Sequence, residues 1–125
     1  MHDQILTPKM FSVFNGTITP EKSKSIANRV LVLQALSQNK FSIDSPGNSE
    51  DVKLMINALQ GNTKEVNAGM AGTVLRFLTA GFSLLPGKRL LTGSKRLKQR
   101  PLAPLTSALQ QLGSEIKFKE KPGFA

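Results

Sequence analysis

The chain contains no cysteine, tryptophan or tyrosine, and it has a single histidine among its 125 residues. Without cysteine it can form neither a disulfide framework nor a thiolate metal site. The one histidine, His2, lies at the N-terminus, so the sequence offers no zinc cluster and no histidine-based triad. No apolar run approaches the roughly 18 residues that a membrane-spanning helix needs, and the first ten residues lack the plan of a signal peptide. We therefore expect a cytoplasmic protein that does not enter membranes.

Acidic residues are also scarce. Seventeen Lys and Arg face eight Asp and Glu, which gives a formal net charge of +9. The hydrophobic fraction of 39% and the charged fraction of 20% are typical of a globular domain. The positive charge favours an anionic partner, which could be a nucleic acid, a membrane surface or a small phosphorylated substrate. Composition does not distinguish these three kinds of partner, so the choice depends on where the basic residues lie in the sequence.

Strand-like and helix-like periodicities alternate along the chain, which predicts an α/β fold with helices layered on a sheet. The expected strands are residues 10–19, 41–44, 64–68, 88–92 and 115–119. The expected helices are residues 23–37, a segment between a cap at Asn48 or Ser49 and Gly61, residues 71–85, and residues 101–112. The apolar stripes that define the first and the last helix are Ile26, Val30, Leu33 and Leu36, and Leu102, Leu105, Leu109 and Leu112.

The first polar cluster, KSKSIANR at 22–29, stands at the start of an expected helix. Backbone N–H groups in a first helical turn have no partner within the helix, and the partial positive charge there favours anions. Lys24, Ser25 and Arg29 would place an ammonium, a hydroxyl and a guanidinium beside those amides. The alternative is an ordinary serine cap with solvated lysines, and the stretch alone leaves both interpretations open.

The second cluster, NAGMAGTVLR at 67–76, joins glycines to the start of an apolar helix. Gly69 and Gly72 would let the backbone approach a ligand, and Thr73 could cap the helix or bind. Arg76, expected in the first turn, runs against the helix dipole and favours an anionic partner. The alternative is a glycine-rich turn with a surface arginine. The spacing fits neither GxGxxG nor the phosphate loop GxxxxGK[ST].

The third cluster, KRLLTGSKRLKQRP at 88–101, holds six basic residues and no acid. Such a run is typical of a solvated face or a nucleic-acid patch. However, no aromatic residue lies between Arg89 and Arg100, so the stacking platforms of single-strand binders are missing. Arg100 directly precedes Pro101, a favoured first helical residue, so we expect its guanidinium at the N-terminus of the last helix.

Taken together, the three clusters resemble the leading part of the 3-phosphoshikimate 1-carboxyvinyltransferase family, also called 5-enolpyruvylshikimate-3-phosphate synthases. SKSIANRVLVLQAL resembles the family's SKS-x-x-NR helix start, and AGTVLRFLTA is similar to its AGT-x-x-R motif. LTGSKRLKQRPLAPLTSALQQLG resembles its LTG…R-x-x-RP-x-x-x-L…AL…LG block. The motifs occur in the family's order, and the resemblance spans nearly the whole chain.

The resemblance implies transfer of the enolpyruvyl group of phosphoenolpyruvate to the 5-hydroxyl of shikimate 3-phosphate, with release of phosphate, in aromatic amino-acid biosynthesis. It implies no metal or organic cofactor, and a monomeric full-length enzyme. The implied roles fall on the three clusters. They are Lys24 as the catalytic residue touching both substrates, Ser25 and Arg29 for shikimate 3-phosphate, Gly72 and Arg100 with Lys24 for phosphoenolpyruvate, Thr73 and Arg76 as supports, and Arg96 as a weaker neighbour.

For the fold, the resemblance implies βαβαββ-type units of the inside-out barrel of enolpyruvyl transferases. Residues 21–125 would form an incomplete lobe, and residues 1–20 would contain an opening strand that belongs with the other lobe. The family's acid/base carboxylates lie beyond this chain, so we expect it to be a fragment that is inactive alone.

Two alternatives remain at this point. A basic nucleic-acid-binding module would rest on the net charge of +9 and on the run at 88–100, with steeply salt-dependent binding. The related UDP-N-acetylglucosamine enolpyruvyl transferase would share the fold but not the three motifs. The motifs favour shikimate 3-phosphate and phosphoenolpyruvate as partners, and no nucleic acid.

Overall fold

The computed structural model describes residues 15–38 and 40–125. In chain order the elements are helix α1 (Lys24–Leu36), helix α2 (Glu50–Gln60), strand β1 (Glu65–Asn67), helix α3 (Gly72–Leu84), strand β2 (Leu90–Thr92), the 3-10 helix η1 (Leu97–Gln99) and helix α4 (Ala103–Gln111). The two strands form a parallel sheet in which Glu65 lies opposite Leu90 and Asn67 opposite Thr92. The fold therefore mixes helices with a small parallel sheet, in agreement with the predicted α/β class.

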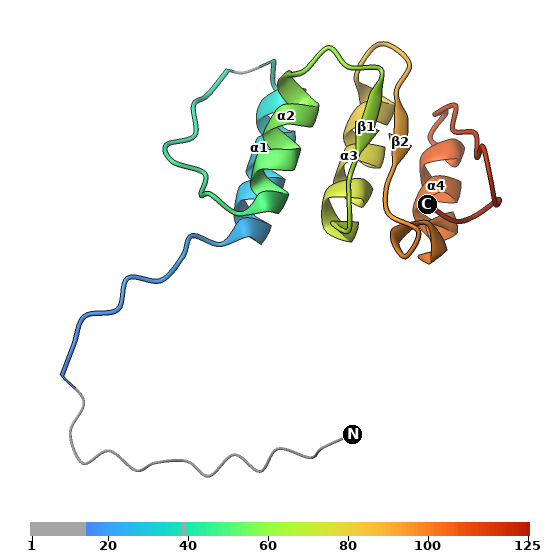
Figure 1. Ribbon diagram of the computed structural model, residues 1–125. Coiled ribbons are helices and arrows are strands. Elements are labelled where there is room, and N and C mark those ends of the chain that lie inside the picture. Colours follow the sequence, from blue (N-terminus) through green and yellow to red (C-terminus); the bar gives the residue numbers. More distant parts are fainter. Residues whose placement is uncertain (1–14, 39) are drawn as a thin grey trace, which may run out of the picture.

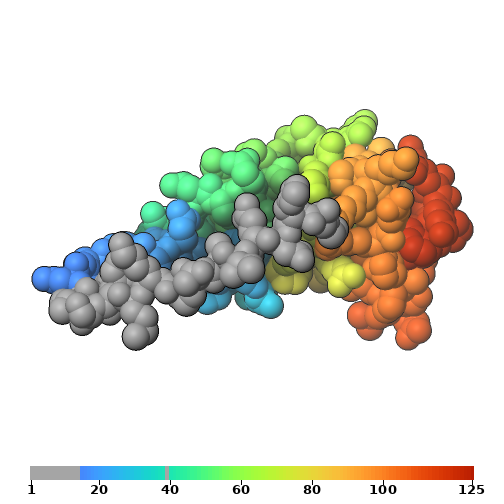
Figure 2. Space-filling view, turned by 60° about the horizontal axis from the view of Figure 1, so that its bottom comes forward, coloured from blue at the N-terminus to red at the C-terminus, as the bar shows by residue number. Residues whose placement is uncertain are grey.

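All four α-helices begin at the same end of the molecule, and the two strands run in the opposite direction (Figure 1). The helices lie side by side, and the colours in Figure 2 pass from blue to red along one long direction. Helix α1 packs against both α2 and α3, α3 also packs against α4, and β1 pairs with β2. The arrangement brings several helix N-termini to one face, where their unpaired amides and partial positive charges add.

Serine caps explain where the first two helices begin. The Oγ atom of Ser23 accepts a hydrogen bond from the backbone N–H of Ile26 at 3.4 Å, and that of Ser49 accepts one from Val52 at the same distance. Helix α2 ends at Gly61, as the sequence predicts. The N-cap of α3 is Ala71, whose side chain makes no capping bond.

The larger hydrophobic core lies between α1, α2 and α3. Its most buried members include Val52 and Met55 of α2 and Val74 and Leu78 of α3, all at most 1% exposed. Helices α1 and α3 approach closely at Gly81, where an added Cβ atom would lie in van der Waals contact, 3.4 Å from Cγ1 of Val32. A smaller cluster joins α3 to the segment after β2 and contains Ala68, Leu75, Leu97 and Leu102.

Three of the predicted strands differ from the structure. Residues 41–44 and 115–119 carry no strand, and neither do residues 15–19 of the predicted strand 10–19, whose residues 10–14 lie outside the described part. Ile116 and Phe118 are half-buried between exposed neighbours, so the predicted alternation is present. A strand also requires a neighbour for its backbone to pair with, and in the described residues only β1 and β2 pair as strands.

The predicted buried stripe of α1 is wrong. Ile26 and Leu33 are 64% and 59% exposed, whereas Ala27, Asn28 and Leu31 are buried. Apolar residues occur around most of this helix, so its periodicity is compatible with either face. Packing against α2 and α3 selects the face that carries the small side chain of Ala27, which permits close contact.

Helix α4 begins two residues later than predicted. Its first residue is Ala103, and Pro104 rather than Pro101 lies in its first turn. Pro101 instead forms an isolated antiparallel bridge with Phe124. Leu112 follows the helix and is 83% exposed, so it is not part of the predicted stripe.

Over the described residues, the helices are too short and too polar for any of them to cross a bilayer.

Candidate anion-binding site

The N-termini of α1, α2 and α3 converge on one open pocket of about 390 Å³. Lys24 is the first residue of α1, Asp51 the second of α2 and Gly72 the first of α3. The lining residues are Lys24, Glu50, Asp51, Leu54, Met70, Ala71, Gly72, Thr73 and Arg100. Three helix N-termini and the basic residues Lys24 and Arg100 thus border a single space together with Glu50 and Asp51. Helix N-termini and basic side chains are groups that favour anions.

One wall of the pocket follows from two turns that come directly after the strands. The Oδ1 atom of Asn67 accepts a hydrogen bond from the N–H of Gly69 at 2.8 Å, and Gly69 has a φ of +56°, in the left-handed region that favours glycine. The N–H of Ser94 donates to the carbonyl of Gly69 at 2.8 Å. A Cβ atom on Gly93 would lie only 3.0 Å from that carbonyl. The glycines therefore let the two turns pack together.

Arg100 lies at the start of α3 rather than at the start of α4. It follows η1 with an extended backbone, so the predicted placement at the N-terminus of the last helix is wrong. Its guanidinium lies over Gly72, because a Cβ atom added there would be 2.6 Å from Nη1 of Arg100. Gly72 thus provides the space that Arg100 occupies, and the cation stands beside the first-turn amides of α3.

Arg76 and Thr73 support this wall in ways that differ from prediction. Arg76 is the fifth residue of α3, beyond the first turn. Its Nη2 atom donates to the carbonyl of Pro101 at 3.2 Å, so it holds the residue after Arg100 instead of an anion. Thr73 makes no capping bond and is exposed at the pocket. With no side-chain cap, the first amides of α3 are available to a ligand.

Ser25 and Arg29 lie on α1 outside the residues that line the pocket. Nη1 of Arg29 donates to the backbone carbonyl of Ser25 at 3.0 Å and also to its hydroxyl. The guanidinium lies over the ring of Phe77, 5.5 Å from its centroid. Arg96 is exposed and precedes η1, also away from the pocket lining. Of the predicted residues, the structure brings together Lys24, Gly72, Thr73 and Arg100.

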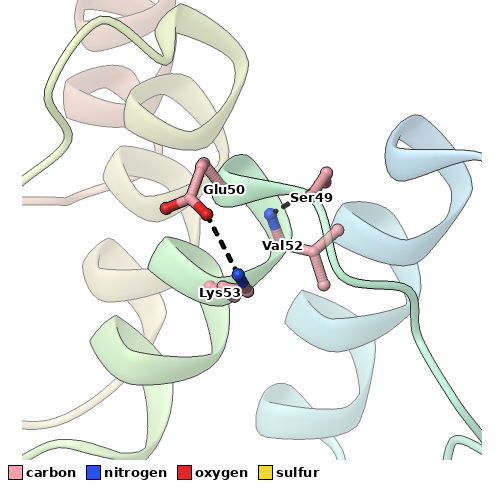
Figure 3. A network of polar contacts seen from close by, with 4 residues as sticks. All are labelled: Ser49, Glu50, Val52 and Lys53. Carbon is pink, nitrogen blue, oxygen red and sulfur yellow. Dashed lines mark hydrogen bonds and ion pairs between the residues drawn. The ribbon is translucent and has the colours of Figure 1, made fainter.

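Sequence reasoning missed the role of Asp51. Asp51 lies in the first turn of α2, and its Oδ2 atom is 3.3 Å from Nζ of Lys24. Glu50, beside it, pairs with Lys53 at 3.0 Å, and Figure 3 shows this pair together with the Ser49 cap. The signal that could have found Asp51 is its position at the start of α2. The fold places this helix start against the start of α1, where Lys24 lies.

A larger hollow of about 930 Å³ lies elsewhere, between α3, β2 and residues 115–125. Seven lysines and arginines and three glutamates line it, among them Lys88, Arg89 and Lys98 of the third cluster. It contains none of the residues with predicted roles. Across residues 15–38 and 40–125, no three His, Cys, Asp or Glu side chains are grouped as metal ligands.

Comparison with known protein families finds matching segments that contain the pocket residues. The sequence model of the family described as EPSP synthase (3-phosphoshikimate 1-carboxyvinyltransferase) matches residues 9–63 and 60–125. The chain belongs to this family. A 3-phosphoshikimate 1-carboxyvinyltransferase of Bacteroides fragilis is 38% identical over 113 residues, which cover 90% of this chain and 28% of that protein.

Other relatives of the same name agree. The protein of Buchnera aphidicola subsp. Baizongia pistaciae is 37% identical, with 97% of this chain and 34% of its own length covered. That of Paraburkholderia phytofirmans is 32% identical, with 91% and 32% covered. The chain therefore spans about a third of the length of these relatives.

Proposed function

We propose that this chain supplies part of the substrate site of an enzyme that transfers the enolpyruvyl group of phosphoenolpyruvate to the 5-hydroxyl of shikimate 3-phosphate and releases phosphate. The observation that carries the proposal is the convergence of Lys24, Arg100 and the uncapped start of α3 on one pocket. The family of the chain and the names of its relatives support the same reaction.

The chemistry of the pocket suits phosphoenolpyruvate, which carries a phosphate and a carboxylate on a small carbon frame. Arg100 can bind one anionic group through two parallel hydrogen bonds, a geometry that a guanidinium provides and an ammonium does not. The first amides of α3, at Gly72 and Thr73, can bind the same group along the helix dipole. Lys24, which lines the same pocket, would contact the other anionic group and reach toward the second substrate.

Ser25 and Arg29 are assigned to shikimate 3-phosphate in this proposal. They lie in the first turns of α1, next to Lys24, and currently satisfy each other through the hydrogen bonds from the guanidinium to Ser25. A phosphate would replace these internal contacts, in which the guanidinium donates to neutral oxygens, by hydrogen bonds between two groups of opposite charge. Arg76 acts through the carbonyl of Pro101 and so orients Arg100. Arg96 would contact a substrate only from the edge of the site.

The acid/base chemistry is assigned to parts of the enzyme outside this chain. Glu50 and Asp51 are the two carboxylates that line the pocket, and they pair with Lys53 and Lys24. Neither is placed as a free general acid or base. We therefore propose that residues 21–125 form a partial lobe of an inside-out barrel, that residues 1–20 belong with the other lobe, and that the full-length enzyme is a monomer. The chain alone would bind substrate without turning it over.

Isothermal titration of the chain with phosphoenolpyruvate, shikimate 3-phosphate and a mixed-sequence oligonucleotide tests the function. At an ionic strength of ~0.15 M, we expect binding of both small anions, weaker phosphoenolpyruvate binding in Lys24→Met, and unchanged binding in Lys53→Met. Lys53 is the matched control because it is also a lysine, lies in the neighbouring helix α2 and forms an ion pair with Glu50. Binding of the oligonucleotide alone would contradict the proposal.

A further inference from the structure

The pocket contains an anion of its own. Asp51 lies 3.3 Å from the ammonium of Lys24, and its side chain is 25% exposed, against 62% for Lys24. The carboxylate is the more buried partner and sits in the first turn of α2, where the helix dipole stabilises a negative charge. Lys24 therefore already has a fixed counter-ion at the position where a ligand would bind.

The two acids at this helix start are paired differently. Glu50 turns to Lys53 within α2, and its side chain is 84% exposed. Asp51 crosses from α2 to α1 and pairs with a residue of the pocket. The adjacent acids thus differ in partner and in exposure, and of the two only Asp51 competes with a ligand for Lys24.

The two cations of the pocket differ in the same way. Among the described residues, no carboxylate lies within ion-pair distance of Arg100, whose guanidinium rests over Gly72. An incoming anion can therefore bind Arg100 and the amides of α3 without displacing anything. It reaches Lys24 only by displacing Asp51.

We propose that Asp51 is a specificity-determining residue that selects ligands with two anionic groups over single anions such as inorganic phosphate. A single anion either remains at Arg100 or competes with Asp51 for Lys24. A ligand that anchors one group at Arg100 presents its second group to Lys24 at a high effective concentration, so it displaces Asp51 more readily. The inference rests on the proposed function, because it favours phosphoenolpyruvate over the phosphate that the reaction releases.

Asp51→Asn tests the proposal, with Glu50→Gln as the matched control that removes the same charge from the adjacent residue. Affinities for inorganic phosphate and for phosphoenolpyruvate are measured by titration for both variants and the parent chain. We expect Asp51→Asn to tighten phosphate binding about threefold to tenfold, as the loss of a partly exposed ion pair allows. Phosphoenolpyruvate affinity should rise less, so the ratio of phosphoenolpyruvate affinity to phosphate affinity should fall. Glu50 also lines the pocket but leaves Lys24 paired with Asp51, so Glu50→Gln measures the effect of the lost charge alone and should change both affinities by the same factor, smaller than the gain in phosphate binding of Asp51→Asn.

Three results would overturn the proposal: weaker or unchanged phosphate binding in Asp51→Asn, an equal gain in Glu50→Gln, or an unchanged ratio. Asp51→Ala serves as a second variant, and circular dichroism melts show that each variant is folded. The phosphate measurements test Asp51 whatever the reaction is. Shikimate 3-phosphate is titrated in parallel, and failure of the parent chain to bind it would count against the proposed function. The test of selectivity by Asp51 does not depend on that result.

Discussion

The larger hollow and the pocket at the helix starts, both formed by described residues, differ in how their positive charges are held. The larger one is lined by seven cations, but these come mostly from exposed residues that flank β2 or belong to the irregular C-terminal segment. The pocket at the helix starts has only Lys24 and Arg100, yet three helix N-termini point into it and Gly72 admits the guanidinium. The comparison teaches that the number of charges is a poor guide to a site, and that fixed donors at a shared point are a better one.

The largest expected effect is in Arg100→Met, compared with Lys119→Met in the larger hollow. The arginine variant loses charge-assisted hydrogen bonds that are worth about 2 kcal/mol, so phosphoenolpyruvate affinity should fall ~30-fold. Lys119→Met removes one positive charge as well and should leave the affinity within about twofold. Titration calorimetry at one salt concentration measures both. Equal losses would mean that net charge, and not the pocket, holds the ligand.

Gly72→Ala separates stability from binding at the pocket. The methyl group would lie 2.6 Å from Nη1 of Arg100, at the end of a flexible side chain, so the guanidinium shifts and the backbone stays. Phosphoenolpyruvate affinity should fall about tenfold because a displaced donor loses its alignment. The free energy of unfolding, measured by thermal denaturation, should change by less than about 1 kcal/mol, because alanine favours a helix more than glycine does. A variant that binds normally would show that Arg100 does not need this position.

Ser49→Ala probes the framework of the pocket. Removing the cap of α2 should lower the free energy of unfolding by about 1 kcal/mol, measured by urea titration. Phosphoenolpyruvate affinity should weaken only about twofold to threefold, through a less ordered helix start beside Lys24 and Asp51. Ser107→Ala, at an exposed serine within α4, is the control: it should leave the affinity unchanged and should not lower the free energy of unfolding, because alanine favours a helix interior more than serine does. A cap variant as stable as the parent would contradict the capping role.

The smallest effect is expected from the double variant Lys117→Met and Lys119→Met. Both side chains are exposed in the irregular segment after α4 and line the larger hollow. Shikimate 3-phosphate and phosphoenolpyruvate affinities should stay within about twofold, because exposed charges are screened by solvent and salt. A tenfold loss would move the ligand to the larger hollow.

The helices could be predicted from the sequence because their signals are local. Ser23, Ser49 and Gly61 mark helix ends by chemistry that acts within a few residues, and the structure confirms them. Strands need a distant partner, and the sequence does not say which segments meet. Residues 41–44 and 115–119 therefore carry a strand-like pattern without forming a strand.

The site was predictable as a set of motifs but not as a geometry. Of the residues that the sequence singled out, Lys24, Gly72, Thr73 and Arg100 are gathered by the fold into one pocket. The sequence assigned Arg100 to the wrong helix, because the contact with Gly72 joins segments that are far apart in the chain. The pairing of Asp51 with Lys24 was missed for the same reason, since it depends on two helices starting at the same level.

The central claim, that anions bind where three helix N-termini meet, is tested most directly by amide chemical shifts in a ¹⁵N-labelled chain titrated with phosphoenolpyruvate. The account predicts that the largest shifts fall on Lys24, Gly72 and Thr73 and on Arg100. Largest shifts in residues 115–121 instead, with the helix starts unchanged, would contradict it.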